Sequence, residues 1–145
     1  MRVLLQRVDY AKCVVDGKVT GETLKGYMLL VGYTFGDTVE KNIKAAKKIA
    51  NLRIFEDENG KMNLSIKDVG GNILSISQFT LYANTEKGNR PSFVEALTPD
   101  EAKKLYLNFN EELREYDLEV GEGVFGAHMD ISLLNSGPVT IMLEF

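Results

Sequence analysis

Residues 73–81 constrain the fold more than any other stretch of this 145-residue chain. They begin with β-branched and aliphatic side chains after a pair of glycines, which is typical of a buried strand. The stretch then turns polar and ends with Ser77, Gln78, Phe79, Thr80 and a leucine. Because polar groups at the end of a buried strand must be satisfied by the fold or by a ligand, this end is a candidate site. The alternative is structural, with Thr80 present for its β-propensity and Ser77 bonded to nearby backbone.

Length and composition predict a single domain that spans residues 1–145. A chain of this size buries roughly two thirds of its unfolded surface, which is enough for one core. No apolar run approaches the roughly 20 residues that a bilayer span needs, so no membrane partner is expected. The lone cysteine, Cys13, is expected to be a small buried side chain, and it fits a reducing compartment. A cytoplasmic location is therefore expected.

The net charge of the chain limits its nucleic-acid partners. A value of −4 argues against a surface that coats DNA or a long RNA, because such surfaces are normally basic. A small enzyme that grips only the end of an RNA could still rely on a local basic patch. DNA is therefore not an expected partner, whereas binding to the end of an RNA is compatible with this net charge.

Hydrophobic periodicity predicts an α+β domain whose sheet is largely antiparallel and curls towards a barrel. Strand patterns occupy residues 2–9, 12–15, 18–20, 27–33, 53–55, 73–81, 118–124, 127–134 and 138–145. Asp16 and Gly17 form the dipeptide favoured in a two-residue hairpin turn. Two helices are expected, at about residues 38–50 and 99–115. The second begins with a hydroxyl cap, a proline and a carboxylate at the favoured positions: Thr98, Pro99 and Glu101.

Several familiar catalytic patterns do not fit the chain. A G-x-G-x-x-G spacing occurs at Gly121, Gly123 and Gly126, but a strand pattern follows it where a dinucleotide fold needs a helix. His128 is the one histidine, and it lies within a strand pattern, so a catalytic base is not expected there. One cysteine and one histidine cannot supply three or four metal ligands. No metal and no cofactor is therefore expected.

Two separated motifs carry a resemblance to a known family. Ser-Gln-Phe-Thr-Leu at residues 77–81 and Asn-Ser-Gly-Pro-Val-Thr at residues 135–140 together resemble the paired signatures of the D-aminoacyl-tRNA deacylases, also called D-tyrosyl-tRNA deacylases. Further short matches follow the same order, at residues 5–8, 53–55, 60–63, 90–93 and 125–127. The resemblance implies a cofactor-independent enzyme that hydrolyses the ester bond of D-aminoacyl-tRNA, and of mischarged glycyl-tRNA, to free amino acid and tRNA.

An aminoacyl ester is already activated, which suits a site without a side-chain base. Main-chain N–H groups around Phe79 and Thr80 could stabilise the oxyanion while the substrate is held in a fixed pose. Thr80 could instead be the nucleophile, although it has no neighbouring base. We favour attack by water, assisted by the free hydroxyl of the terminal ribose, with Thr80 and Gln78 as positioning groups and Ser77 beside them.

The second motif centres on Gly137 and Pro138, which by themselves indicate an ordinary turn. The resemblance implies that this pair is cis, that it reaches across a homodimer interface into the partner's active site, and that its carbonyls exclude an L side chain. By the same resemblance Arg7 steadies the loop and Phe125 supports the site. The alternative for Arg7 is an exposed surface arginine. Ser136 stands where the family has aspartate, which puts the stiffness of the loop in question.

Two other segments are candidate contacts for tRNA. The first helix carries lysines that could hold phosphates or simply face water: Lys41, Lys44, Lys47 and Lys48. Residues 83–92 are polar and contain glycine and proline, so a loop is expected beside the strand end, where it could grip a substrate. A non-catalytic module that binds an RNA end or a protein is the competing interpretation, in which the polar strand end only binds a ligand.

Overall fold

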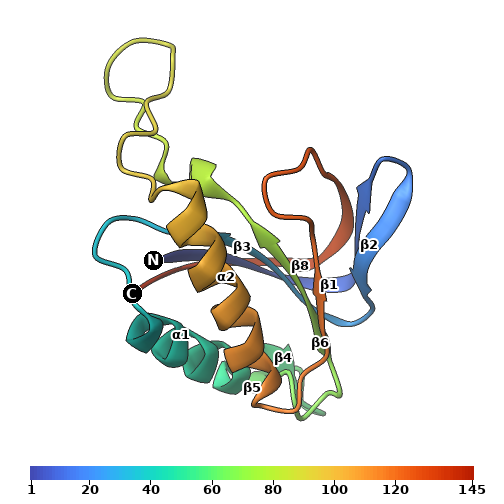
Figure 1. Cartoon of the computed structure of the whole chain (residues 1–145). Coiled ribbons are helices and arrows are strands. Elements are labelled where there is room, and N and C mark those ends of the chain that lie inside the picture. The colour runs from blue at the N-terminus through green and yellow to red at the C-terminus, as the bar shows by residue number, and fades with distance from the viewer.

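The computed structural model describes residues 1–145, which form a strongly curled sheet with two helices packed on one side (Figure 1). The strands are β1 Arg2–Val15, β2 Lys18–Thr23, β3 Gly26–Gly32, β4 Phe55–Glu56, β5 Met62–Leu64, β6 Asn72–Ser77, β7 Val120–Glu122 and β8 Asp130–Glu144. The helices are α1 Val39–Asn51, the short 3-10 helix η1 Phe79–Tyr82, and α2 Pro99–Arg114. The α+β class and the two main helices agree with the sequence prediction.

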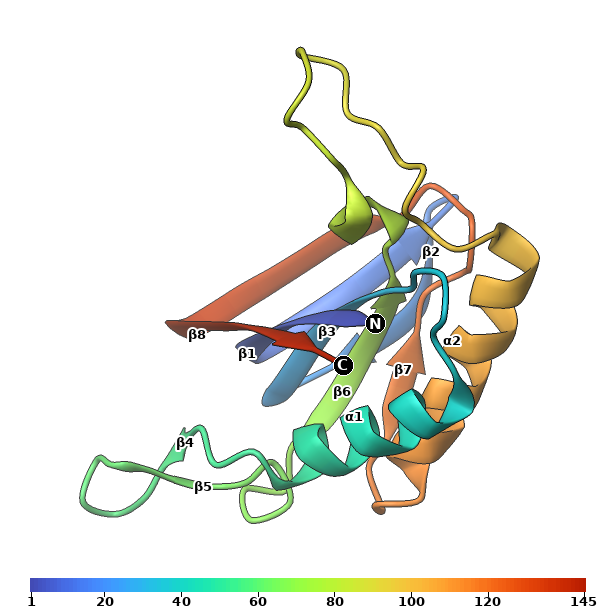
Figure 2. The same cartoon turned by 90° about the vertical axis from the view of Figure 1, so that its left-hand side faces the viewer.

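The main sheet has the strand order β2-β1-β3-β6-β7, and β8 pairs with the other edge of β1. The three pairs that involve β1 are antiparallel, whereas β3–β6 and β6–β7 are parallel, so the sheet is mixed. The curl brings β2 close to β7 and almost closes a barrel (Figure 2). Glycines allow this approach, because a Cβ atom added to Gly21 would lie 2.5 Å from the Glu122 carbonyl oxygen.

The hairpin predicted at Asp16 and Gly17 is confirmed. Both residues have positive φ, 49° and 75°, as a two-residue turn between twisted strands requires. β1 itself is longer than predicted, because the two patterns at residues 2–9 and 12–15 form one continuous strand. This length lets β1 pair with β3 near its start, with β2 near its end, and with β8 along most of its length.

The strand predicted at residues 73–81 is wrong at its end. β6 stops at Ser77, and the chain then turns into η1, where Phe79 is 57% exposed instead of packed in the sheet. The reason is the length of the neighbouring strand. Ser77 pairs with Val31, and β3 ends at Gly32, so the residues beyond Gln78 have no partner strand to follow. The polar residues therefore lie on a turn at the edge of the sheet.

The two helices pack against one face of the sheet over the larger hydrophobic core. α2 begins at Pro99 as predicted, and the Thr98 hydroxyl donates to the Glu101 carboxylate at 2.6 Å. The buried face of α1 does not follow its apolar residues alone, because Ile43 is 45% exposed and Asn42 is fully buried. The side-chain amide of Asn42 forms three hydrogen bonds. It accepts from the Tyr33 hydroxyl and donates to the Leu105 carbonyl and to the Asn108 side-chain oxygen.

The last two predicted strands, residues 127–134 and 138–145, form the single strand β8, which begins only at Asp130. The predicted alternation near its end is confirmed, because residues 139, 141 and 143 are half-buried while residues 140, 142 and 144 are exposed. β8 pairs with β1 alone, so its second edge carries no strand. Cys13 is buried on the inner face of the sheet, as expected. No helix has the length and apolar character required to span a bilayer.

Asp37 is expected to make a large, pH-dependent contribution to the stability of this fold. Its buried carboxylate accepts bonds from the Met1 ammonium at 2.6 Å, from Lys41 at 2.7 Å and from the Thr34 amide at 2.8 Å. Burial alone would raise the pKa of Asp37, but these bonds and charges outweigh it and hold the pKa below its usual value of 3.8. The stabilisation is therefore complete above about pH 4 and is lost as pH falls through the lowered pKa.

Replacing Asp37 by Asn should lower the free energy of unfolding by about 3 kcal/mol at pH 7, because it leaves a buried cation without its counter-charge. Urea titrations at pH 7 and at pH 3 would measure the difference, which should shrink at the lower pH. Glu40→Gln is the matched control, since this neighbouring carboxylate is exposed. A difference that stays the same at both pH values would contradict the assigned role.

Candidate functional site

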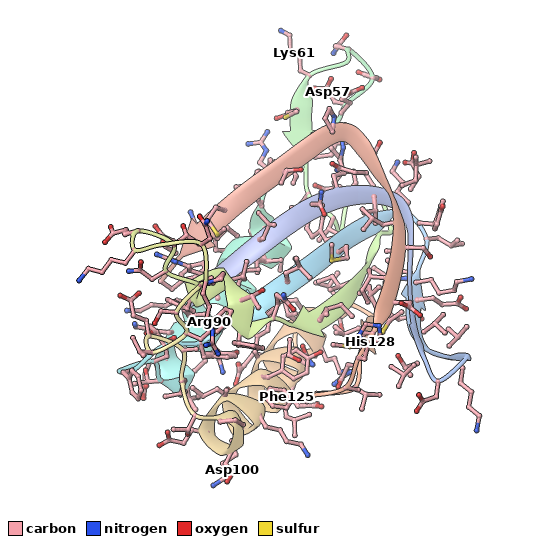
Figure 3. All side chains as sticks on the ribbon, turned by 90° about the horizontal axis from the view of Figure 1, so that it is seen from above. Asp57, Lys61, Arg90, Asp100, Phe125 and His128 are labelled. Atoms are coloured by element: carbon pink, nitrogen blue, oxygen red, sulfur yellow. The ribbon has the colours of Figure 1, made fainter.

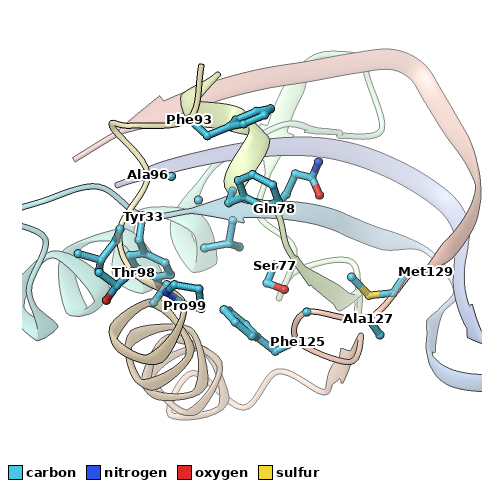
Figure 4. Close-up of a pocket in the computed structure, with 16 residues that line it drawn as sticks. Tyr33, Ser77, Gln78, Phe93, Ala96, Thr98, Pro99, Phe125, Ala127 and Met129 are labelled. Carbon is cyan, nitrogen blue, oxygen red and sulfur yellow. The ribbon is translucent and has the colours of Figure 1, made fainter. Parts of the chain in front are cut away.

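The polar end of β6 opens into a pocket of about 470 Å³ between η1, the start of α2 and the 123–129 segment (Figure 4). Ser77, Gln78 and Phe79 line it, and so does Phe125 from the segment before β8. The structure thus brings together residues that are about 50 positions apart in the sequence. Thr80 is not a lining residue, but its hydroxyl accepts a hydrogen bond from the Gln78 side-chain amide.

The backbone of η1 presents unpaired donors beside this pocket. The Gln78 N–H donates to the Val31 carbonyl at 2.7 Å, which fixes the start of the turn to β3. The turn then closes with a bond from the Leu81 N–H to the Gln78 carbonyl. A 3-10 turn that starts at this carbonyl leaves the N–H groups of Phe79 and Thr80 without a partner inside the turn. These two donors are the main-chain N–H groups of η1 that the turn itself does not use.

The walls of the pocket are mainly apolar and aromatic. Phe79 and Phe93 meet edge to face with ring centroids 5.0 Å apart, and both are partly exposed. The ring centroids of Phe125 and Tyr106 of α2 lie 6.0 Å apart, and this contact positions Phe125 in the opposite wall. Pro99 and other small side chains from the start of α2 complete the lining. The sequence did not indicate Phe93, although residues 90–93 belong to one of the short family matches.

No carboxylate, lysine, arginine or histidine lines this pocket. Tyr33 is its one ionisable residue, and burial raises the pKa of its phenol well above the usual range, with a further contribution from Asp37. The Tyr33 hydroxyl donates to Asn42 at 3.0 Å, so it serves the packing of α1. His128 is 94% exposed, and its Nε2 atom lies 3.6 Å from an Asp130 carboxylate oxygen. The polar groups that this chain offers to the pocket are therefore hydroxyl, amide and main-chain groups.

A second pocket of about 460 Å³ lies on the inner face of the curled sheet and joins the first. The two share Gln78, Ala127 and Met129. The rest of its lining is mostly apolar: Gln6, Met28, Leu30, Ile76, His128, Ile131 and Leu133. An apolar concave surface of this kind, next to the unpaired edge of β8, is typical of a surface that a further protein segment covers.

The Gly137–Pro138 peptide bond is cis, and both residues are exposed on β8. Neither lines the first or the second pocket of the same chain. Arg7 is only 8% exposed, and it donates to the Ser136 carbonyl at 3.2 Å and to the Ile54 carbonyl at 2.7 Å. Arg7 is therefore not a surface arginine, and it connects this loop to the segment before β4.

Asn135 is a further support of the loop that the sequence did not single out. Its amide donates to the Arg7 carbonyl and to the Val139 carbonyl, both at 3.0 Å, and so bridges the irregular part of the β1–β8 pairing. The Ser136 hydroxyl forms no hydrogen bond within the chain, and only its carbonyl is held. The Asn in the second motif was the available signal, because asparagine commonly bonds to nearby backbone.

No three or more His, Cys, Asp and Glu side chains converge as metal ligands would. The Gly121, Gly123 and Gly126 pattern does not precede a helix, because β8 follows it. Gly123 instead permits close packing, since a Cβ atom there would lie 2.5 Å from the Met129 sulfur.

Comparison with known proteins places this geometry in a defined group. The profile of the family described as D-Tyr-tRNA(Tyr) deacylase matches residues 4–144. A protein of Lactobacillus gasseri named D-aminoacyl-tRNA deacylase is 57% identical over 144 residues, covering 99% of each chain. A protein of Deinococcus radiodurans with the same name is 56% identical with the same coverage.

Two solved structures are similar over almost the whole chain. One is described as c-Myc DNA Unwinding Element Binding Protein, with a TM-score of 0.92 and 39% identity, covering 100% of this chain and 99% of that one. The other is described as a probable eukaryotic D-amino acid tRNA deacylase, with a TM-score of 0.83 and 20% identity. It covers 98% of this chain and 97% of that one, and this likeness establishes the fold.

Proposed function

Because this chain belongs to the D-Tyr-tRNA(Tyr) deacylase family and is a D-aminoacyl-tRNA deacylase, we propose that η1 and the end of β6 form its catalytic centre. The observation that carries this proposal is the pair of free main-chain donors, at Phe79 and Thr80, beside an apolar pocket with no charged side chain. Such donors are worth most where water is excluded, because the local dielectric constant is low. The pocket walls supply that environment.

The reaction follows from these donors. The N–H groups of Phe79 and Thr80 bind the ester carbonyl oxygen and stabilise the negative charge that develops when water attacks the carbon. The ribose oxygen then leaves with a proton that originates from the attacking water, relayed through the neighbouring ribose hydroxyl. The products are the free D-amino acid and the tRNA. Thr80 and Gln78, which are bonded to each other, position the ester and the water.

The apolar pocket suits the terminal base of the tRNA. Its volume of about 470 Å³ lies in the usual range for small-ligand sites. The exposed ring edges of Phe79 and Phe93 offer an aromatic surface on which a base can stack. With the base in this pocket, the ester lies at η1 and the amino acid points towards the second, joined pocket.

We propose that a second copy of the chain supplies Gly137 and Pro138 to this site. The substrate carries an ammonium group, and the pocket has no carboxylate to receive it, so carbonyl oxygens from elsewhere are needed. The exposed Gly137–Pro138 loop, held by Arg7 and Asn135, presents such oxygens on a firm support. A homodimer that covers the concave face and the free edge of β8 would bring them in.

Selectivity for D-amino acids then arises from main-chain sterics. The carbonyl oxygens leave no room for an L side chain, whereas a D side chain points outward. A site of this kind rejects a substrate only when a side chain occupies the L position on the α-carbon. Glycine has no side chain, so glycyl-tRNA is an expected substrate. We place the reaction in the cytoplasm, because a single buried thiol fits a reducing compartment.

Thr80→Ala should reduce kcat on D-tyrosyl-tRNA only modestly, by about tenfold, because the hydroxyl orients groups and the Thr80 N–H remains. The paired measurement is the release of labelled tyrosine from D- and L-tyrosyl-tRNA by the wild type and the variant. The wild type should turn over the D substrate many times and leave the L substrate intact. Complete loss of activity in Thr80→Ala would favour a covalent nucleophile, and comparable hydrolysis of both substrates would refute the steric account of selectivity.

A further inference from the structure

A nine-residue arm, residues 84–92, projects from the molecule between η1 and α2 (Figure 1). It ends directly before Phe93, which lines the apolar pocket. Its two ends are joined by a pair of backbone bonds between Asn84 and Ser92, at 2.8 and 2.9 Å. The Asn84 side chain also accepts from the Glu86 N–H at 3.0 Å. Gly88 turns the chain at the tip with a φ of +70°. The arm is therefore a preformed hairpin-like loop.

The base of the arm is part of the pocket. Phe93, directly after the arm, lines the pocket and packs against Phe79. The Thr34 hydroxyl donates to the Glu95 carbonyl at 2.5 Å, and the Leu97 N–H donates to the Tyr33 carbonyl at 3.0 Å, which fixes the following segment to the end of β3. The arm consequently keeps a defined position relative to any ligand in the pocket.

The arm carries two free cationic side chains. Lys87 and Arg90 are exposed, and neither forms an ion pair with any carboxylate of the chain. Glu86 is the one acidic residue in the arm, so residues 84–92 have a net charge of +1 in a chain whose total charge is −4. Arg90 is three residues from Phe93, so its Cα lies within about 11 Å of a pocket-lining residue.

The other basic candidates are less well placed. The exposed lysines of α1, which include Lys44 and Lys47, lie on a helix at the opposite end of the molecule from the arm (Figures 1 and 2). Lys41 of the same helix is paired with Asp37. Lys61 lies on the β4–β5 hairpin, and Figure 3 shows it at the edge of the molecule away from Arg90. The arm combines two unpaired cations with a position directly before the pocket-lining Phe93.

We propose that Lys87 and Arg90 bind backbone phosphates of the tRNA next to the nucleotide whose ester is cleaved. The proposal rests on the proposed catalytic site, because it takes the reacting end to occupy the pocket beside Phe93. Phosphates are the chemistry that fits, since the arm offers two cations and few apolar side chains, and an arginine guanidinium can donate two parallel hydrogen bonds to a phosphate. The arm then aligns the RNA without contacting the ester.

The test measures the activity of the wild type and of the double variant Lys87→Gln/Arg90→Gln on two substrates. One substrate is D-tyrosyl-tRNA, and the other is 3′-O-D-tyrosyl-adenosine, which has the same ester and no neighbouring phosphates. The double variant should lose about tenfold in kcat/KM on the tRNA and nothing on the small ester. When the salt concentration rises from 50 to 200 mM, kcat/KM on the tRNA should fall for both proteins. The fall should be about sevenfold larger for the wild type, because the variant makes two fewer phosphate contacts.

The matched control is Lys44→Gln/Lys47→Gln, which removes the same charge from α1 and should leave both activities unchanged. Equal tRNA activity of the arm variant and the wild type would refute the proposal, and so would equal losses on both substrates or an equal loss in the α1 variant. Failure of the proposed catalytic site is a different result, because Phe79→Pro would then hydrolyse both substrates as fast as the wild type. Lys87→Arg, which keeps the charge, should retain most of the activity on tRNA.

Discussion

Phe79→Pro should lower kcat by about 10² to 10³-fold, because it removes one of the two main-chain donors that we assign to the oxyanion. Proline is acceptable to the fold at this position. Phe79 is the first residue of η1, where the N–H has no partner inside the turn, and Gln78 before it has an extended backbone with φ −148° and ψ 91°. Single-turnover hydrolysis of D-tyrosyl-tRNA would measure the loss.

The matched control is Phe79→Ala, which removes the same aromatic ring and keeps the N–H group. It should weaken binding, and so raise KM, with a much smaller effect on kcat. The ring of Phe79 is 57% exposed, so neither variant should change the thermal midpoint by more than a few degrees. Equal values of kcat for the two variants would contradict a main-chain oxyanion site.

Gly137→Ala should reduce activity on D-tyrosyl-tRNA at least 100-fold, because the loop cannot keep its path with a Cβ atom. Gly137 has a φ of +112°, and a Cβ atom there would lie 2.8 Å from an Arg7 nitrogen and 3.1 Å from a Val139 methyl group. The exposed loop would shift away from the partner's pocket, while the core of each protomer remains intact. Ser136→Ala is the control, since the hydroxyl of Ser136 forms no bond and its carbonyl is retained.

The proposed cross-subunit arrangement also predicts the activity of a mixture of these two variants. In a mixed dimer of Phe79→Pro and Gly137→Ala protomers, one site carries both defects, and the other combines an intact η1 with an intact loop. Random mixing should therefore restore about a quarter of the wild-type activity, although each variant alone should keep about 1% or less. No recovery after the subunits have exchanged would show that the loop serves the pocket of its own chain or neither pocket.

Local signals predicted much of the secondary structure. The hairpin at Asp16 and Gly17 depends on two residues that accept positive φ, and the start of α2 depends on Thr98 and Pro99. Each of these features is decided within four residues of the chain. The position of Ser77, Gln78 and Phe79 on one pocket also follows from their adjacency, so the existence of a polar site at the end of β6 was predictable.

Features that depend on distant residues were not predictable. The end of β6 at Ser77 is set by where β3 stops, which no pattern in residues 73–81 records. Asn42 is buried because α2 brings Leu105 and Asn108 to it, and a helical pattern counts only apolar side chains. Phe93 joins the pocket through the return of the 84–92 arm, which depends on the pairing of its two ends.

The unpaired donors of η1 have a consequence for how this enzyme tolerates genetic change. A peptide N–H is present whatever the side chain, so no substitution except proline deletes it. Inactivating substitutions should therefore concentrate at positions that determine the path of the backbone, such as Gly137 in β8 and the residues that anchor the turn. The side chains of the pocket walls, by contrast, can vary between homologues without loss of the reaction.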